Sequence, residues 1–117
     1  MKVTVYGIRN CDTMKKAFAW LDARGVAYDF HDYKKGGVPR GKLKAWAASG
    51  GFERLANTRG PTWRKIPEAA RANLTEAKMI ALLEANTSAI RRPIVETGKT
   101  LLVGFDEKAF GEALKTR

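Results

Sequence analysis

The chemistry that this sequence can perform centres on one cysteine. Cys11 is the only cysteine among 117 residues, and it stands in the stretch YGIRNCDTMKK, between a segment with strand character and one with helix character. A thiol reacts as its thiolate, and an ordinary cysteine, with a pKa of about 8.5, is mostly protonated at neutral pH. The N–H groups and the dipole at a helix N-terminus stabilise a negative sulfur. Cys11 is therefore a candidate nucleophile.

The neighbours of Cys11 act on its charge in opposite directions. Lys15 and Lys16 follow about one helical turn later and favour the thiolate, whereas Asp12 places a carboxylate beside it. A structural role is the alternative, because free cysteine is among the residues most often buried as a small apolar side chain. The spacing alone leaves both interpretations open.

The chain contains no second thiol that could resolve a disulfide. Met14 occupies the second position of what would be a Cys-x-x-Cys pair. A redox cycle must therefore take its second thiol from glutathione, another protein or another copy of the chain. One cysteine and one histidine do not form a usual metal-ligand set, so we expect no metal and no bound cofactor. His31 is a conceivable partner for Cys11, but its alternating neighbours favour a strand residue at the end of a sheet.

Two arginines stand in loop-like sequence and are candidates for binding an anion near the thiolate. Arg59 lies in NTRGP, and Arg92 directly precedes Pro93 in IRRPIV. Arginine suits this task because its planar guanidinium stays charged and binds oxyanions through two hydrogen bonds. Arg92 should project from an extended segment, because a residue before proline is restricted to extended conformations. Either arginine can equally be an exposed surface charge, which is the commoner case.

The elements that would position these residues begin with a βαβ unit. Residues 2–6 alternate as a strand does and end at Gly7, and from Asp12 onward the apolar residues follow the helical period. Gly25 is a helix stop, and residues 26–31 alternate again as a second strand. Two strands joined in this way should be parallel.

The rest of the chain continues with short helices and then a hairpin. We expect a basic turn at residues 34–37, helices over residues 43–47 and 74–84, and a loop at NTRGPTWRK. Residues 94–95 and 101–103 flank Thr97, Gly98 and Lys99 as a β-hairpin, and Asp106 is a candidate N-cap for a final helix. This order predicts an α/β fold with one mixed sheet and flanking helices.

Length and composition set the class of protein. Residues 1–117 suit one domain, in which about residues 35–88 form a helical insertion after the second strand. No apolar run approaches the roughly 20 residues of a membrane-spanning helix, and the N-terminus lacks the features of an export signal. With a single cysteine, we expect a cytoplasmic protein. The net charge of +10 predicts anionic partners without choosing among nucleic acid, acidic proteins, glutathione and small oxyanions.

Four motifs together resemble a known family over essentially the whole chain. YGIRNCDTMKK, the HDY at residues 31–33, NTRGPTWRK and the RRPI at residues 91–94 are similar, in order and spacing, to the arsenate reductase (ArsC) family. The similarity is greatest to its YffB branch, and the Spx regulators are more distant relatives. The resemblance implies a thioredoxin-like fold interrupted by a helical insertion.

The resemblance also implies roles for individual residues. Cys11 corresponds to the nucleophilic thiol, Arg59 and Arg92 to the anion-binding arginines, and Pro93 to the cis-proline of thioredoxin-like folds. Lys15 falls where arsenate reductases carry a further basic residue, and Asn10, directly before the cysteine, joins the same anion-binding set. Glutathione is implied as the co-substrate of an anionic or disulfide substrate, with glutaredoxin as a further candidate donor. We expect the protein to act as a monomer.

Two positions depart from the arsenate reductases. Gly7 stands where they carry a histidine, and Gly104 stands where they carry a third arginine. The resemblance therefore implies a glutathione-dependent thiol reductase, as in the YffB branch, rather than an arsenate reductase in particular.

The alternative is an Spx-like transcription regulator that binds RNA polymerase through its basic surface. The VGFDE segment near the C-terminus resembles the Spx pattern, whereas Met14 replaces the second cysteine of the Spx redox switch. Direct nucleic-acid binding ranks last, because it rests on charge alone and the aromatic residues are not interleaved with basic ones.

Overall fold

A computed structural model describes residues 2–39, 41–98 and 100–114. The chain divides into two compact units, which we call the sheet unit (Met1–Tyr33 with Arg92–Arg117) and the helical unit (Lys34–Arg91). The order of elements, βαβ followed by helices and then ββα, is the one predicted from the sequence. The helical unit includes the segment expected as an insertion. That residues 1–117 act as one domain stays a prediction.

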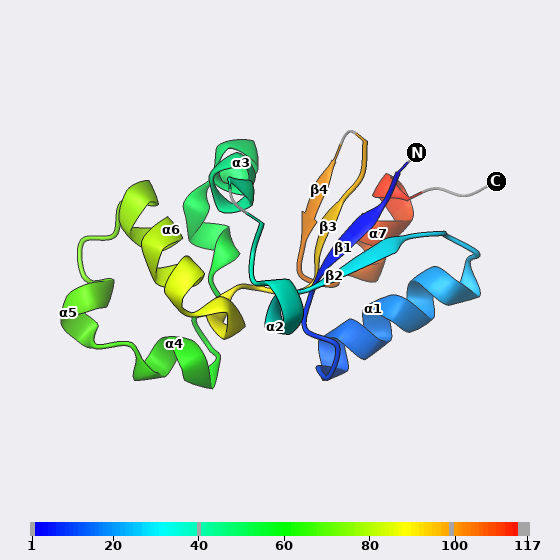
Figure 1. Cartoon of the computed structure of the whole chain (residues 1–117). Coiled ribbons are helices and arrows are strands. Elements are labelled where there is room, and N and C mark those ends of the chain that lie inside the picture. The colour runs from blue at the N-terminus through cyan, green and yellow to red at the C-terminus, as the bar shows by residue number, and fades with distance from the viewer. Residues whose placement is uncertain (1, 40, 99, 115–117) are drawn as a thin grey trace. The chain divides into compact units, whose positions relative to one another are not determined.

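The sheet unit contains a four-stranded mixed sheet in the order β2-β1-β3-β4 (Figure 1). Its strands are β1 (Thr4–Gly7), β2 (Asp29–Asp32), β3 (Ile94–Glu96) and β4 (Leu101–Val103). β1 pairs with β2 in parallel, as the βαβ pattern predicts, and with β3 antiparallel. β3 and β4 pair antiparallel across the predicted hairpin, in which Lys99 lies outside the described residues. Gly7 is the last residue of β1, so the strand ends where the sequence predicts.

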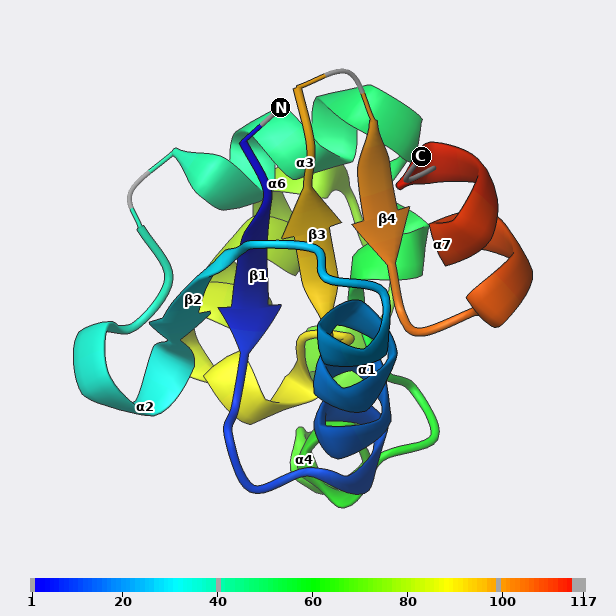
Figure 2. The same ribbon diagram turned by 90° about the vertical axis from the view of Figure 1, so that its right-hand side faces the viewer.

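Two helices cover one face of this sheet. Figure 2 shows α1 (Asp12–Ala23) in front of the strands and α7 (Glu107–Ala113) next to β4. The apolar positions of α1 recur at helical spacing, which places them together on the face that meets the sheet. The core of the unit consists of Val3, Val5, Met14, Ala17, Trp20, Leu21, Val95, Leu102, Phe110 and Leu114.

The ends of both helices follow from local sequence. Gly25 adopts a left-handed conformation with φ +67°, and its N–H donates to the carbonyl of Asp22 while that of Val26 donates to Leu21. These two bonds form a Schellman motif, which ends α1 where the sequence predicts. The carboxylate of Asp106 accepts from the N–H of Lys108 at 3.1 Å, so the predicted N-cap of α7 is confirmed.

The helical unit has buried residues of its own. It comprises α2 (Tyr33–Gly36, which begins one residue before the unit), α3 (Lys42–Gly50), α4 (Pro61–Lys65), α5 (Glu68–Arg71), α6 (Glu76–Ala85) and two 3₁₀ helices, Phe52–Leu55 and Thr87–Ala89. α3 packs against α6 and the first 3₁₀ helix. The buried apolar residues of these elements include Leu43, Trp46, Leu55, Trp63, Met79 and Leu83.

Two sequence predictions in this unit were wrong. NTRGPTWRK was expected to be a loop, but α4 begins within it at Pro61. Proline is favoured in the first turn of a helix, because its missing N–H has no intrahelical partner there and its φ is already helical. The basic turn at residues 34–37 is mostly α2 instead. In the described part of the chain, no helix has the length and apolar character needed to cross a membrane.

Candidate active site

Cys11 lies at the junction between β1 and α1, where the sequence places it. It is the N-cap residue of α1, with φ −145° and ψ 131°, and its carbonyl accepts the first intrahelical bond from the N–H of Lys15 at 2.9 Å. Extended backbone at this position is usual for an N-cap. The thiol is half-buried. Cys11 is therefore partly accessible to solvent and lies at a helix N-terminus.

The sheet brings an arginine to the cysteine from the other end of the chain. The Nε–H of Arg92 donates to Sγ of Cys11 at 3.3 Å, between residues 81 apart in sequence. Pairing of Tyr6 with Ile94 brings β3 alongside β1, so that the segment before β3 lies near the end of β1. The bond between Arg92 and Pro93 is cis, as the resemblance implied. One of the two predicted arginines thus contacts the thiol.

The surroundings lower the pKa of the Cys11 thiol. Burial by itself raises this pKa, but the backbone N–H of Met14, the hydrogen bond and charge of Arg92, and the backbone N–H of Thr13 together outweigh burial. These N–H groups belong to the first turn of α1, where the helix dipole also stabilises a negative sulfur. The thiolate fraction of Cys11 at neutral pH is therefore higher than that of an ordinary cysteine.

The other residues predicted around the anion lie on exposed positions. Asn10 precedes the cysteine, and Lys15 lies in the first turn of α1. Both are on the same segment as the thiol. Their predicted contacts with an anion stay predictions.

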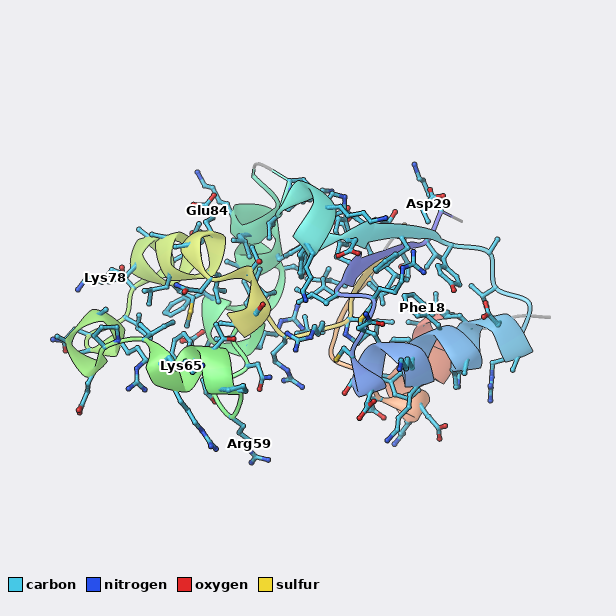
Figure 3. All side chains as sticks on the ribbon, turned by 60° about the horizontal axis from the view of Figure 1, so that its bottom comes forward. Phe18, Asp29, Arg59, Lys65, Lys78 and Glu84 are labelled. Carbon is cyan, nitrogen blue, oxygen red and sulfur yellow. The ribbon has the colours of Figure 1, made fainter. Side chains whose placement is uncertain are left out.

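Arg59 belongs to the helical unit and is exposed; Figure 3 shows its side chain extending away from the ribbon. It lines a cavity of about 380 Å³ in that unit, together with Ala56, Asn57, Thr58 and Arg91. Hydrogen bonds from the N–H of Asn57 to the carbonyl of Ala89 and from that of Arg91 to Leu55, each 2.7 Å, hold the two sides of the cavity together. The predicted action of Arg59 at Cys11 stays a prediction.

His31 is a strand residue, as the alternation in sequence indicates. It lies in β2 opposite Tyr6 of β1, and its ring lies 5.5 Å from that of Tyr6 and 6.4 Å from that of Tyr33. These ring contacts account for the position of His31 without a catalytic role.

Sequence reasoning missed a polar group beside this site. The hydroxyl of Tyr6 donates to Oε1 of Glu96 at 2.8 Å. Tyr33 is only 2% exposed, and its buried hydroxyl has no hydrogen-bond partner within residues 2–39, 41–98 and 100–114. Burial raises the pKa of Tyr33, and Tyr6 and Glu96 raise it further while the charge of Arg92 opposes them. Tyr33 belongs to the HDY motif, but the residue type and spacing of this motif do not indicate that the tyrosine is buried.

The two departures from the arsenate reductases have structural reasons. A Cβ at Gly7 would lie 2.5 Å from Sδ of Met14 and 3.4 Å from Cβ of Arg92, so a side chain at this position collides with the core. Gly104 has φ +81°, which other residues rarely adopt. Its N–H donates to the carbonyl of Pro93 at 2.8 Å. A histidine at position 7 would have to displace the side chain of Met14, and an arginine at position 104 would strain the backbone.

Replacing Gly7 with Ala should destabilise the protein by about 1–3 kcal/mol, because Met14 is fully buried and has to leave its place for the added methyl group. Urea unfolding followed by circular dichroism measures the difference. Gly111→Ala is the matched control, because its Cβ meets none of the described residues within 4 Å. In the interior of α7 this substitution should stabilise the protein by about 0.5–1 kcal/mol. Equal stability of Gly7→Ala and the wild type would show that Met14 moves aside freely.

Among the described residues, no group of three or more histidine, cysteine, aspartate or glutamate side chains is placed to hold a metal ion. The candidate reactive site of the sheet unit thus consists of Cys11 and the groups that stabilise its thiolate.

Comparison with known proteins identifies the family. A model of the ArsC family matches residues 6–113. The chain belongs to the ArsC family. A solved structure of a protein named YFFB is 50% identical, with a TM-score of 0.93 and coverage of 97% of this chain and 99% of that one. An arsenate reductase (ArsC) related protein from Brucella melitensis is 42% identical, with a TM-score of 0.76 and coverage of 99% and 97%.

A regulator also occurs among the relatives of this ArsC-family chain. The global transcriptional regulator Spx of Streptococcus mutans is 28% identical over 107 residues, which cover 90% of this chain and 77% of that protein. The predicted resemblance to YffB, the arsenate reductases and Spx is therefore confirmed. The mixed sheet with its flanking helices is thioredoxin-like, and the chain has the thiol oxidoreductase fold of the ArsC family.

Proposed function

We propose that the protein is a glutathione-dependent thiol-disulfide oxidoreductase with Cys11 as its nucleophile. The observation that carries this proposal is the 3.3 Å hydrogen bond from Nε of Arg92 to Sγ of Cys11. A cysteine that only filled space would not need a half-buried cation aimed at its sulfur, whereas a nucleophile needs its thiolate stabilised. The lowered pKa of Cys11 agrees with this role.

In the first proposed step, the Cys11 thiolate attacks one sulfur of a substrate disulfide. A mixed disulfide forms between Cys11 and that sulfur, and the other sulfur leaves as a thiolate. Because Met14 occupies the place of a resolving cysteine, the chain cannot release the product by itself. A glutathione thiolate then attacks the mixed disulfide, and Cys11 leaves as the thiolate that Arg92 stabilises. With glutathione disulfide as substrate this cycle is an exchange; with other disulfides it is a net reduction.

Charge supports an anionic substrate or co-substrate. The net charge is +10, and we propose that Arg92, with Lys15, Asn10 and Arg59, attracts the carboxylates of glutathione or an oxyanion on the substrate. Arsenate is a less suitable substrate, because Gly7 and Gly104 replace two residues of the arsenate reductases. We further propose a monomer that works in the reducing cytoplasm, with glutaredoxin as an alternative electron donor.

The proposal is tested by following Cys11 during exposure to glutathione disulfide. Intact-mass spectrometry should show one glutathione adduct per chain, located at Cys11 and removed again by excess glutathione. A coupled assay with hydroxyethyl disulfide, glutathione, glutathione reductase and NADPH should then show steady turnover. An adduct that glutathione does not remove, or the lack of any turnover, would rule out a glutathione-dependent cycle on disulfides.

The second candidate is an Spx-like regulator of transcription. The Spx relatives support it, since the similarity to Spx covers 90% of this chain. Co-purification of the tagged protein with RNA polymerase subunits, at a stoichiometry unaffected by nuclease treatment, would favour this function. Turnover of disulfides without such association would favour the enzyme.

A further inference from the structure

The hydroxyl of Tyr33 is a buried polar group for which the described residues of the reduced protein supply no partner. Tyr33 is 2% exposed, and its oxygen makes no hydrogen bond to any residue that the structure describes. Buried hydroxyls are normally paired, and leaving one unpaired costs its full desolvation penalty. An unpaired buried hydroxyl in a native structure calls for an explanation, and one explanation is a partner that appears in another state of the protein.

Arg92 is the group beside Tyr33 whose partner must change during the proposed reaction. In the sheet, Gly7 of β1 pairs with Asp32, directly before Tyr33, while Tyr6 pairs with Ile94, two residues after Arg92. Tyr33 and Arg92 therefore lie at the same end of the sheet, on either side of β1. Their electrostatic interaction shows that the guanidinium charge acts on the hydroxyl.

The hydrogen bond that Arg92 makes depends on the redox state of Cys11. In the reduced protein Nε donates to the sulfur, which as a thiolate is a strong acceptor. When Cys11 attacks a disulfide, its sulfur gains a covalent partner and loses its negative charge. A disulfide sulfur is a weak acceptor, whereas the guanidinium keeps its charge and its donors. Arg92 thus loses this acceptor when the intermediate forms.

We propose that Tyr33 is a positioning residue of the Cys11 site: its hydroxyl accepts a hydrogen bond from Arg92 once the sulfur of Cys11 is in a disulfide. The tyrosine oxygen has two acceptor lone pairs and makes no hydrogen bond within the described part of the reduced chain. Formation of the mixed disulfide then exchanges one acceptor of Arg92 for another. The proposal rests on the proposed function, because it assigns Tyr33 to the mixed-disulfide intermediate of that cycle.

The test is the variant Tyr33→Phe, compared with the wild type in two states. The first state is the reduced protein. The second carries a methylthio group on Cys11, made with methyl methanethiosulfonate, which releases methanesulfinate as the thiolate attacks. In the reduced state we expect Tyr33→Phe to melt at the same temperature as the wild type or a few degrees higher, because only an unpaired hydroxyl is removed. In the methylthio state it should melt lower than the wild type.

A second readout uses the equilibrium with glutathione. Across a series of glutathione redox buffers, Tyr33→Phe should form the mixed disulfide about tenfold less readily than the wild type, the size expected for one hydrogen bond to a charged group. The pKa of Cys11 in the reduced variant should stay as in the wild type. Tyr6→Phe is the matched control: it breaks the hydrogen bond to Glu96 and should lower the melting temperature equally in both states.

Two results would overturn the proposal. A lower melting temperature of reduced Tyr33→Phe would mean that the hydroxyl already has a partner in that state. Equal melting temperatures of variant and wild type in the methylthio state would mean that Arg92 does not donate a hydrogen bond to the hydroxyl of Tyr33. Neither measurement depends on turnover. If the enzyme assay shows no turnover but Tyr33→Phe behaves as expected, the proposed function is ruled out and the role of Tyr33 is not.

Discussion

Cys11→Ser should reduce disulfide turnover to the uncatalysed background, a loss of at least about a thousandfold, while the fold is retained. A serine hydroxyl is not ionised near neutral pH and cannot form the mixed disulfide on which the proposed cycle depends. The rate is measured with hydroxyethyl disulfide and glutathione in the coupled assay. This is the largest effect that we expect from a single substitution.

The local structure explains why the Cys11→Ser protein should remain folded. Position 11 is the N-cap of α1, and serine is among the preferred residues there because its oxygen accepts hydrogen bonds from the first turn. Circular dichroism and thermal unfolding should therefore match the wild type or show slightly higher stability. Turnover by the Cys11→Ser variant, in a sample free of wild-type protein, would mean that the reaction does not use Cys11 as its nucleophile.

Arg92→Gln should raise the pKa of Cys11 and slow its alkylation several-fold at pH 6–7. Burial raises this pKa, and the hydrogen bond and charge of Arg92 are among the groups that overcome it. Because only the thiolate reacts, a raised pKa moves the midpoint of the rate–pH profile to higher pH. At a pH well above the midpoint, variant and wild type should react at similar rates, since both thiols are then ionised.

The measurement is the rate of reaction with iodoacetamide, a neutral reagent, across pH. Its neutrality separates the ionisation of Cys11 from attraction of an anionic reagent. Arg24→Gln is the matched control, because Arg24 is exposed at the C-terminal end of α1, the opposite end from Cys11, and should leave the profile unchanged. If the rate–pH profile of Arg92→Gln had the same midpoint as that of the wild type, stabilisation of the thiolate would come from the N-terminus of α1 alone.

Local sequence determined the elements of this protein and the placement of its nucleophile. The change from alternating to helical periodicity around Cys11 predicts the junction of β1 and α1, because side-chain period and capping are properties of neighbouring residues. Gly25 and Asp106 mark helix ends for the same reason. Pro61 was misjudged, since a proline is compatible with a loop and with a helix start alike.

The composition of the site was decided by tertiary structure. Periodicity carries no information on pairs that are 81 residues apart, so the contact between Arg92 and Cys11 follows from the pairing of β1 with β3. In sequence, Arg92 stood out only through its loop-like position before Pro93 and through the RRPI motif of the family. Tyr33 had no signal of its own, because burial and the lack of a hydrogen-bond partner depend on what the fold packs around a side chain.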